Sequence, residues 1–390
     1  MVWGNNKKLL RNGHAAAASL RVTVAPMLSR RAYRRFCLVL LLACLWVLGA
    51  WLPGRGYVER SRPPLALHFD GTQPFANGRA GVKQGAWHGY IDHAGNLVIP
   101  LKYQDARPFR EGLAAVEWGE KWGYIDKQGK TVIPFQFARA LDFSEGLAAV
   151  HNGQGWGFIN KAGQVVIPCQ FDHVLNFKEG LAAVKRGSKW GYVNRAGRLV
   201  IPCKFDNVYS FSDGLARVKQ GNSWSFIDDK GRVQIGEFFT WAQPFHEGLA
   251  AASKDGFWGY INTSGQWEIG AQFHQALKFT EGLAPVMWQS RWGYINRQGV
   301  LVIPYTYEEA WYFREGLALV RQGNKWGYID STGALVIPCQ FDNAESFSEG
   351  KAPVKFAKEW GYINRAGQPV FPYALQVAMQ KPLSDTLEGE

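Results

Sequence analysis

Cysteine is scarce in this chain, which limits the ways in which covalent bonds could hold it together. Only five cysteines occur in 390 residues, and Cys37 and Cys44 lie in an apolar segment. The other three, Cys169, Cys203 and Cys339, follow an Ile-Pro pair at one position of a repeated unit. Three is an odd number, so a disulfide framework is not indicated. We interpret these side chains as small buried apolar groups, with a bridge between Cys169 and Cys203 as the alternative.

The chain also lacks the short motifs that mark metal, nucleotide and nucleophile sites. It contains no HExxH, no CxxC, no EF-hand loop, no GxSxG elbow and no Walker loop. His88 and His93 flank one predicted strand, but such a pair alone is a weak indication of a metal site. We therefore predict no cofactor, no metal and no catalytic residue, and hence a protein that is not an enzyme.

Positive charge is in excess, but it is not spread over the chain. The formal net charge is +12, and residues 1–35 carry eight basic residues without any Asp or Glu. The remaining residues therefore have a net charge of only +4. A nucleic-acid interface needs a basic face or stripe, so nucleic acid is not the partner that this distribution favours.

One long apolar run is present near the N-terminus. Residues 36–52 are 17 uncharged residues that follow Arg34 and Arg35 and end before Pro53. As a helix this segment would reach about 25 Å, just enough to cross a bilayer. The positive flank predicts a single-pass inner or cytoplasmic membrane protein, with its N-terminus in the cytoplasm and its repeats outside, periplasmic or extracellular. A cleaved signal peptide, with Met27 as the true start, is the alternative.

Beyond residue 74 the chain repeats with a fixed period. A repeat of fixed period takes precedence over the two or three domains that the length alone would suggest. We therefore expect one repeat domain of nine copies. Each copy begins with a phenylalanine, 34 residues after the previous one: Phe75, Phe109, Phe143, Phe177, Phe211, Phe245, Phe279, Phe313 and Phe347.

Each copy has the pattern of short strands joined by glycine-containing turns. In the fourth copy, residues 180–184, 190–194 and 199–202 are rich in aromatic and β-branched residues, which predicts three strands. Asn194 and Gly197 suit a type I turn between the last two strands. Glycines at four places per copy exclude a helical hairpin of the same period. We predict a three-stranded antiparallel meander, ended by Pro202 and linked by a 3₁₀-like turn.

These motifs carry a family resemblance. Lys-Trp-Gly-Tyr-Ile-Asp occurs at residues 121–126 and 325–330, preceded by Glu-Gly-Leu-Ala and followed by Gly-x-x-Val-Ile-Pro. This pattern resembles the WG-repeat (KWG-repeat) family of bacterial β-repeat proteins, and the resemblance covers residues 75–372. It implies a β-rich repeat module, often in exported or cell-surface proteins, and it brings no catalytic residues.

The copies are too small to fold alone, so they must stack on one another. We predict an all-β, open, superhelical β-solenoid-like array, preceded by one N-terminal hydrophobic helix. A closed propeller-like toroid is the alternative, although propellers typically have about four to eight blades of four strands. The expected organisation is a basic cytoplasmic segment at 1–35, an anchor or signal peptide at 36–52, a linker with a half-repeat cap at 53–74, nine repeats at 75–372, and a C-terminal cap and tail at 373–390.

Residues that recur in every copy are more readily explained by structure than by function. The repeated Trp is expected in the core, and the repeated Glu or Asp is expected to stabilise a turn. Copies five and six depart from the pattern, with Ser225 in place of Gly, and Gly236 and Gly270 in place of Pro. This departure is either a hinge or neutral drift.

Function is therefore sought where the copies differ, at the tip of the first hairpin of each copy. We predict a non-catalytic scaffold, anchored in the membrane and facing the cell envelope, that presents a repeat surface to a protein or an anionic cell-wall polymer. The alternatives are ordinary solvated tips and an exported hydrolase with its site in a groove among Glu and His residues. The oligomeric state stays open. The candidate binding residues are Trp118, Trp288, Phe356, Lys185, Arg186, Lys219 and Arg321.

Overall fold

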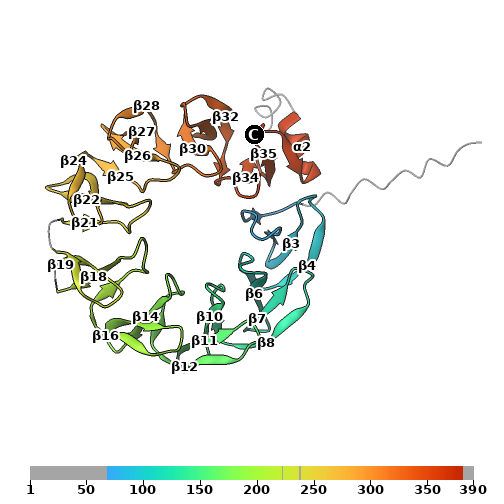
Figure 1. Cartoon of the computed structure of the whole chain (residues 1–390). Coiled ribbons are helices and arrows are strands. Elements are labelled where there is room, and N and C mark those ends of the chain that lie inside the picture. Colours follow the sequence, from blue (N-terminus) through green and yellow to red (C-terminus); the bar gives the residue numbers. More distant parts are fainter. Residues whose placement is uncertain (1–67, 222, 237–238, 381–390) are drawn as a thin grey trace, which may run out of the picture. The chain divides into compact units, whose positions relative to one another are not determined.

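The computed structural model describes residues 68–221, 223–236 and 239–380, all of which belong to one compact unit, Arg62–Glu390. They form nine four-stranded antiparallel sheets, each built from strands that are consecutive in the chain. We call each sheet a blade and number the blades from 1 (β1 to β4) to 9 (β33 to β36). Figure 1 shows the blades arranged around a central opening.

The first strand of each blade has only two residues, and no pattern of residue types predicts it. It pairs with the end of the second strand, as Asp105 does with Glu117. The predicted three-stranded meander is therefore wrong, because the expected 3₁₀-like link is a short inner strand. These strands are β1 (Gly71–Thr72), β5 (Asp105–Ala106), β9 (Arg139–Ala140), β13 (His173–Val174), β17 (Asn207–Val208), β21 (Trp241–Ala242), β25 (Gln275–Ala276), β29 (Glu309–Ala310) and β33 (Asn343–Ala344).

The second strand begins at the repeated Gly-Leu-Ala motif, and its apolar residues are buried on both faces of the sheet. Small side chains such as Ala114 and Ala115 let the neighbouring blades approach closely. The second strands are β2 (Ala80–Gln84), β6 (Leu113–Trp118), β10 (Leu147–His151), β14 (Leu181–Arg186), β18 (Ala216–Gln220), β22 (Leu249–Lys254), β26 (Leu283–Trp288), β30 (Leu317–Gln322) and β34 (Lys351–Phe356).

The third strand carries the Trp-Gly pair. In β7, a Cβ atom on Gly123 would lie 2.7 Å from the backbone oxygen of Ile133 on the fourth strand, so only glycine fits. The third strands are β3 (Trp87–Ile91), β7 (Lys121–Asp126), β11 (Trp156–Asn160), β15 (Lys189–Asn194), β19 (Ser223–Ile227), β23 (Phe257–Asn262), β27 (Arg291–Asn296), β31 (Lys325–Asp330) and β35 (Glu359–Asn364).

The fourth strand lies at the outer edge of the ring, as β4, β8, β12 and β28 show in Figure 1. Pro202 does not end this strand as predicted, because an edge strand needs no N–H donor on its open side. The fourth strands are β4 (Leu97–Tyr103), β8 (Thr131–Phe137), β12 (Val165–Phe171), β16 (Leu199–Phe205), β20 (Val233–Ile235), β24 (Trp267–Phe273), β28 (Leu301–Tyr307), β32 (Leu335–Phe341) and β36 (Pro369–Phe371).

Blade 5 has Ser225 where other blades have glycine, and its fourth strand, β20, has three residues. The described pairing between β19 and β20 ends at Phe226 with Ile235. The replacement of proline by glycine does not by itself shorten a fourth strand, since β24 keeps seven residues with Gly270 at that position.

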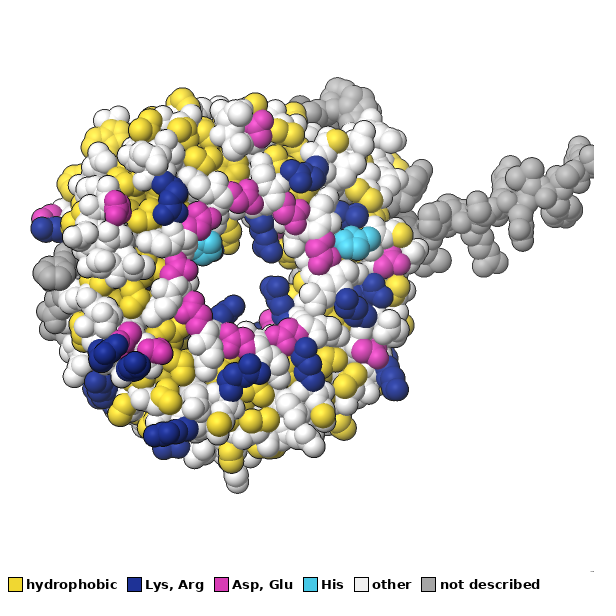
Figure 2. Space-filling view, viewed as in Figure 1, with side chains coloured by type: hydrophobic (Ala, Val, Ile, Leu, Met, Phe, Trp, Pro, Cys, Tyr) yellow, Lys and Arg dark blue, Asp and Glu magenta, His cyan; other side chains and the backbone are white. Residues whose placement is uncertain are grey.

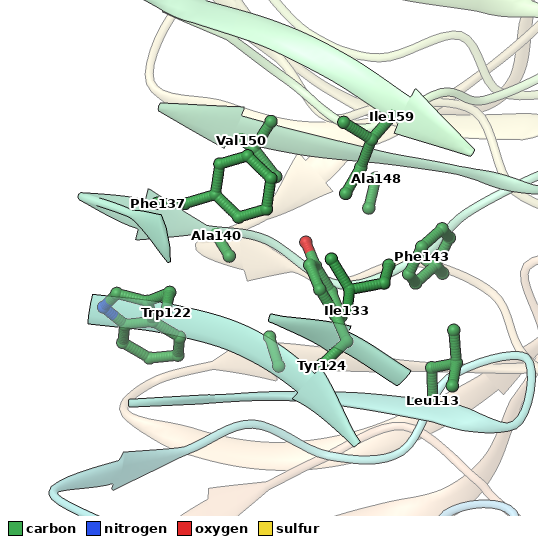
Figure 3. Close-up of a cluster of buried hydrophobic side chains, with 11 residues drawn as sticks. Leu113, Trp122, Tyr124, Ile133, Phe137, Ala140, Phe143, Ala148, Val150 and Ile159 are labelled. Atoms are coloured by element: carbon green, nitrogen blue, oxygen red, sulfur yellow. The ribbon is translucent and has the colours of Figure 1, made fainter. Parts of the chain in front are cut away.

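The hydrophobic core lies between blades. In the cluster of Figure 3, Tyr124 and Ile133 of blade 2 face Ala148, Val150 and Ile159 of blade 3, and all five are fully buried. We call the contact between two neighbouring blades a seam. An aromatic pair lies at each seam: Tyr192 meets Phe211 edge to face, with ring centroids 5.0 Å apart. The tyrosine hydroxyl also donates to a backbone oxygen of the next blade, as Tyr192 does to Tyr209 at 2.7 Å.

The last blade meets the first through the same contacts, which closes the ring. The Tyr362 hydroxyl donates to the backbone oxygen of Gln73 at 2.7 Å, and the Tyr362 and Phe75 rings are 5.2 Å apart. The Ser348 hydroxyl donates to the backbone oxygen of Phe75, as Ser144 does to Phe177 at an internal seam. The predicted open solenoid is therefore wrong. The fold is a closed nine-bladed β-propeller.

The one helix among the described residues is α2 (Tyr373–Gln380), which follows β36 and packs on blade 9. Its Leu375 is fully buried and lies against Gly361, where other blades place the end of their fourth strand. No helix within the described ranges is long and apolar enough to cross a membrane. The predicted single-pass membrane localisation is thus not supported, and its anchor at 36–52 and the basic segment 1–35 lie outside the described residues.

Ring closure can be tested with a matched pair of variants. Tyr362→Phe removes the hydroxyl at the closing seam, and Tyr192→Phe removes its equivalent at an internal seam. Both should lower the free energy of unfolding by a similar amount, about 1–3 kcal/mol, because each leaves a backbone oxygen without its donor. Urea unfolding monitors both. A neutral Tyr362→Phe beside a destabilising Tyr192→Phe would indicate an open array.

Candidate functional site

The strand order gives the ring two distinct faces. The hairpins between second and third strands all lie on one face, together with the links to the next blade; we call this the tip face. The turns between third and fourth strands, such as Asp126 to Lys130, lie on the other, as do the turns before the second strand, such as Arg110 to Leu113. We call this the turn face. All seven predicted binding residues lie on the tip face.

Only part of the predicted set is available to a partner. Trp118 and Trp288 are 48% and 37% exposed, and Arg186 is also exposed. Phe356 is half-buried and packs against the core cluster of blades 8 and 9. Arg321 is paired with Glu309 at 2.6 Å.

Trp118 borders an open hollow of about 420 Å³ on the tip face, between blades 1 and 2. Trp87 also lines this hollow; it is 49% exposed, and the sequence analysis missed it. It is the first residue of β3, where other blades have mainly charged or small residues, so a comparison of copies at this position could have found it. The hollow is lined by Trp87, Leu101, Lys102, Gln104, Trp118 and Gly119.

The Trp118 indole is held in place by other rings. Its centroid lies 5.9 Å from that of Tyr103 and 6.1 Å from that of Phe135. The Lys102 ammonium lies 5.1 Å from the Trp118 centroid, within the range of a cation–π contact. One wall of the hollow is therefore rigid and carries a cation.

Trp288 belongs to a related cluster between blades 6 and 7. Its ring stacks on His274 with centroids 4.5 Å apart, and His274 lies 5.9 Å from Phe257. Phe257, His274 and Trp288 occupy the positions of Trp87, Gln104 and Trp118, five repeats further along the chain. His274 occupies the repeat position that Gln104, a lining residue of the hollow, has between blades 1 and 2. Because His274 is aromatic, the cluster between blades 6 and 7 is a stack of rings.

Four cations occupy the tip face of blades 4 and 5: Lys185, Arg186, Lys204 and Lys219. We call them the basic sector. Within the described residues none of them forms an ion pair, and each lies 4.9–6.0 Å from the centroid of an aromatic ring. Lys189, by contrast, pairs with Asp206 and lowers the pKa of that carboxyl. The structure thus places Lys185, Arg186 and Lys219 on the tip face of two neighbouring blades, together with Lys204.

The recurring carboxylates serve the ring itself. Glu145 precedes a glycine at the turn before the second strand and has a φ of 54°, an unfavourable value for a residue with a side chain. Its carboxylate accepts a hydrogen bond from the Gly180 N–H of the next blade at 2.9 Å. The same link crosses all nine seams, with Asn77 in place of the acid in blade 1.

These links place the acidic side chains around the inner rim, and Figure 2 shows acidic groups surrounding the central opening. Several have cationic partners, as Glu111 has Lys161 at 3.0 Å. Burial alone would raise the pKa of Glu111, but the hydrogen bonds from Lys161 and Gly146 lower it. The role is thus between blades rather than only within a turn. These carboxylates were the basis of the hydrolase alternative, and their oxygens are occupied by backbone and lysine donors.

Arg217 is a charged residue inside a seam. It is 2% exposed, between blades 5 and 6, where blades 2, 3, 4 and 6 have alanine. Its guanidinium carbon lies 3.8 Å from the Tyr209 ring centroid and 4.4 Å from those of Trp224 and Trp241. Burial lowers the pKa of Arg217. Its Nε and Nη1 atoms have no hydrogen-bond partner among the described residues.

The cysteines and histidines form no metal site in the part of the chain that the structure describes. Cys169, Cys203 and Cys339 are free thiols, which excludes the bridge between Cys169 and Cys203 in this structure. Burial raises the pKa of all three. His93 instead contacts Glu349 across the closing seam at 3.0 Å.

Sequence comparison identifies the repeats. The family described as "WG containing repeat" matches the chain eight times, and no curated protein matches it by sequence. The matched segments are residues 89–122, 122–154, 156–190, 190–224, 224–256, 258–287, 292–326 and 326–358.

Structure comparison supports the fold alone. The crystal structure of a eukaryotic initiation factor has a TM-score of 0.56 at 12% identity, over 76% of this chain and 96% of that chain. Hsv2p from Kluyveromyces lactis scores 0.38 at 10% identity, over 58% and 92%. PorZ, a surface component of the type-IX secretion system of Porphyromonas gingivalis, scores 0.30 at 7% identity, over 78% and 52%.

Replacing Arg217 tests whether its charge is costly. Arg217→Met keeps much of the volume and removes the desolvated charge, so the free energy of unfolding should rise by about 1 kcal/mol or more. Chemical denaturation measures the change, with Arg198→Met on the exposed turn face as the control. A loss of stability confined to Arg217→Met would show that the aromatic cage more than offsets desolvation.

Proposed function

Because the chain belongs to the family of proteins with WG-containing repeats, and because it carries the basic sector and the exposed indoles of Trp87, Trp118 and Trp288 on one face, we propose that it is a non-catalytic binding propeller whose tip face holds an anionic polymer. The observation that carries the proposal is the basic sector, a group of cations without acidic partners among the described residues.

The two faces use their charges differently. On the turn face, several acids and bases hold neighbouring blades together, as in the contacts of Lys161 with Glu111 and of Arg297 with Glu247, whereas exposed cations such as Lys130 and Arg198 form no ion pair within the described residues. On the tip face, each cation of the basic sector lies near an aromatic ring and none forms an ion pair within the described residues, while Arg186 also donates a hydrogen bond to the Gln170 amide oxygen. Cations in this state attract an anionic partner over a distance comparable to the Debye length and can then pair with it.

Binding without catalysis fits the distribution of residue types. A catalytic group acts at one place, whereas the carboxylates recur in eight blades and accept hydrogen bonds from the following blade. The residues that differ between blades are mainly lysines, arginines and aromatic residues on hairpin tips. Such groups bind partners but supply no acid–base pair for hydrolysis.

A polymer suits the layout better than a compact partner. The basic sector lies in blades 4 and 5, the hollow between blades 1 and 2, and the ring stack between blades 6 and 7. These groups are small and separated around the ring, whereas a stable protein interface has a contiguous desolvated centre. A repeating anionic chain can reach several such groups with the same chemistry each time.

Two matched triple variants test this proposal. Lys185→Gln/Arg186→Gln/Lys219→Gln removes three tip-face cations, and Lys130→Gln/Arg198→Gln/Lys230→Gln removes three exposed turn-face cations of the same residue types. The first should weaken binding of the full chain to immobilised polygalacturonate by about tenfold or more, and the second should change it little. Retention is measured over a salt gradient.

Residues 1–35 are unchanged in both variants, so their basic charge cannot produce a difference between the two. Equal weakening by both triples, or no retention of the wild type at low salt, would refute the proposal. Poly-L-glutamate as a second matrix shows whether the face recognises polyanions in general or a polysaccharide in particular.

A further inference from the structure

We propose that the hollow between Trp87 and Trp118 is a binding site for a sugar ring that carries a carboxylate. This deepens the proposed function, on which it rests, by naming the unit of the polymer that the tip face recognises. The two indoles, the Lys102 ammonium and the Gln104 amide line the hollow and would contact the sugar.

The two indoles are not there for the fold. The residue at the position of Trp87 is Lys121 in blade 2 and Lys189 in blade 4, and the position of Trp118 is Arg186 in blade 4, yet those blades have the same strands. Trp87 and Trp118 nevertheless expose about half of their surface to water, at 49% and 48%. Exposed indoles that line a hollow are surfaces that gain by being covered.

The hollow has the size and rigidity that a small ring needs. Its volume of about 420 Å³ lies in the range of small-molecule sites. Trp118 is packed against Tyr103 and Phe135, so it loses little conformational freedom when a ligand covers its open face. A sugar ring presents an apolar C–H face that stacks on an indole, while its hydroxyl groups remain in water or bond to an amide such as that of Gln104.

The charge of the hollow selects an acidic sugar. Lys102 is one of its lining residues, no Asp or Glu lines it, and Lys102 forms no ion pair within the described ranges. The ammonium lies above the Trp118 indole, 5.1 Å from its centroid. A carboxylate on a stacked sugar can therefore reach this cation in a charge-assisted hydrogen bond.

Single-stranded nucleic acid also stacks on aromatic side chains, but it fits this site less well. Proteins that bind single-stranded nucleic acid have a positively charged groove along the path of the sugar-phosphate backbone, since every nucleotide carries a phosphate. The hollow offers one cation. A polysaccharide with a carboxylate on each sugar, or on alternate sugars, matches one cation per stacked ring.

The test is calorimetric titration of the full chain with trigalacturonate and with the neutral galactose trisaccharide. We expect the wild type to bind trigalacturonate about tenfold more tightly than the neutral sugar. Trp87→Ala and Trp118→Ala should each weaken trigalacturonate binding by about tenfold. Lys102→Gln should abolish the preference for the acidic sugar while leaving the neutral sugar unaffected.

Trp311→Ala is the matched control, because Trp311 is an indole of similar exposure, 45%, that does not line the hollow. It should leave trisaccharide binding unchanged. The site assignment fails if the wild type does not bind trigalacturonate, if Trp87→Ala and Trp118→Ala bind like the wild type, or if a thymidine oligonucleotide competes at lower concentration. If Trp87→Ala or Trp118→Ala loses trisaccharide binding but still binds the polymer, the hollow and the basic sector are separate sites. If the triple tip-face variant binds the trisaccharide like the wild type, that separation is confirmed.

Discussion

The contact between the face of one blade and the face of the next is the interaction on which the whole structure depends. Each core cluster spans a seam, and each seam has an edge-to-face aromatic pair such as Tyr192 with Phe211. A blade therefore has no core until its neighbours are in place. The faces of blades 9 and 1 are apolar like those of the other blades. If these two blades were apart, both apolar faces would be exposed to water; in the closed ring, Tyr362 packs on Phe75. Closure follows from the identity of the repeats rather than from a special closing strand, since the strands of each described sheet come from one continuous segment.

The seams also explain why so much of each repeat is constant. The glycine after the tryptophan is required because the fourth strand crosses it at less than the distance of a normal Cβ contact. Blade 5 is the exception, with Ser225 at that position, and the seam beside it accommodates Arg217 among three aromatic rings. The acidic residue before the next glycine adopts a left-handed backbone conformation that has a cost, which the hydrogen bond to the neighbouring blade offsets. Residues with such roles vary little, so most differences between blades lie at the two faces of the ring.

The tip face and the turn face differ in which side chains are available to a partner. Several charges on the turn face, such as Lys161 and Arg297, are bound to acidic or backbone groups of the neighbouring blade. The tip face keeps cations above aromatic rings and indoles beside a hollow, and its hairpins can change without disturbing a seam. A propeller built in this way separates stability from recognition: the first lies in the repeated seams, the second in a few side chains of particular blades. A search for residues that occur once, rather than for residues that recur, is therefore the way to find its sites.

The sequence alone determined the family, the period, the number of copies, the all-β class and the burial of the repeated phenylalanine and tyrosine positions, because these follow from residue types at fixed spacing; the repeated tryptophan is buried in some blades and half-buried in others. It also identified Trp118, Trp288 and the cations Lys185, Arg186 and Lys219 as variable tip residues. It could not reveal the two-residue first strand, which is too short to have a pattern, or the closure of the ring, which depends on the angle between packed faces. It gave no means of pairing Trp87 with Trp118, or Lys102 with either, since they come together only where two blades meet. Arg321 and Phe356 belong to the same predicted set, and only the tertiary structure shows that an acid and a core cluster already occupy them. Spacing along the chain determines which residues share a blade, whereas the contacts between blades decide which of them share a site.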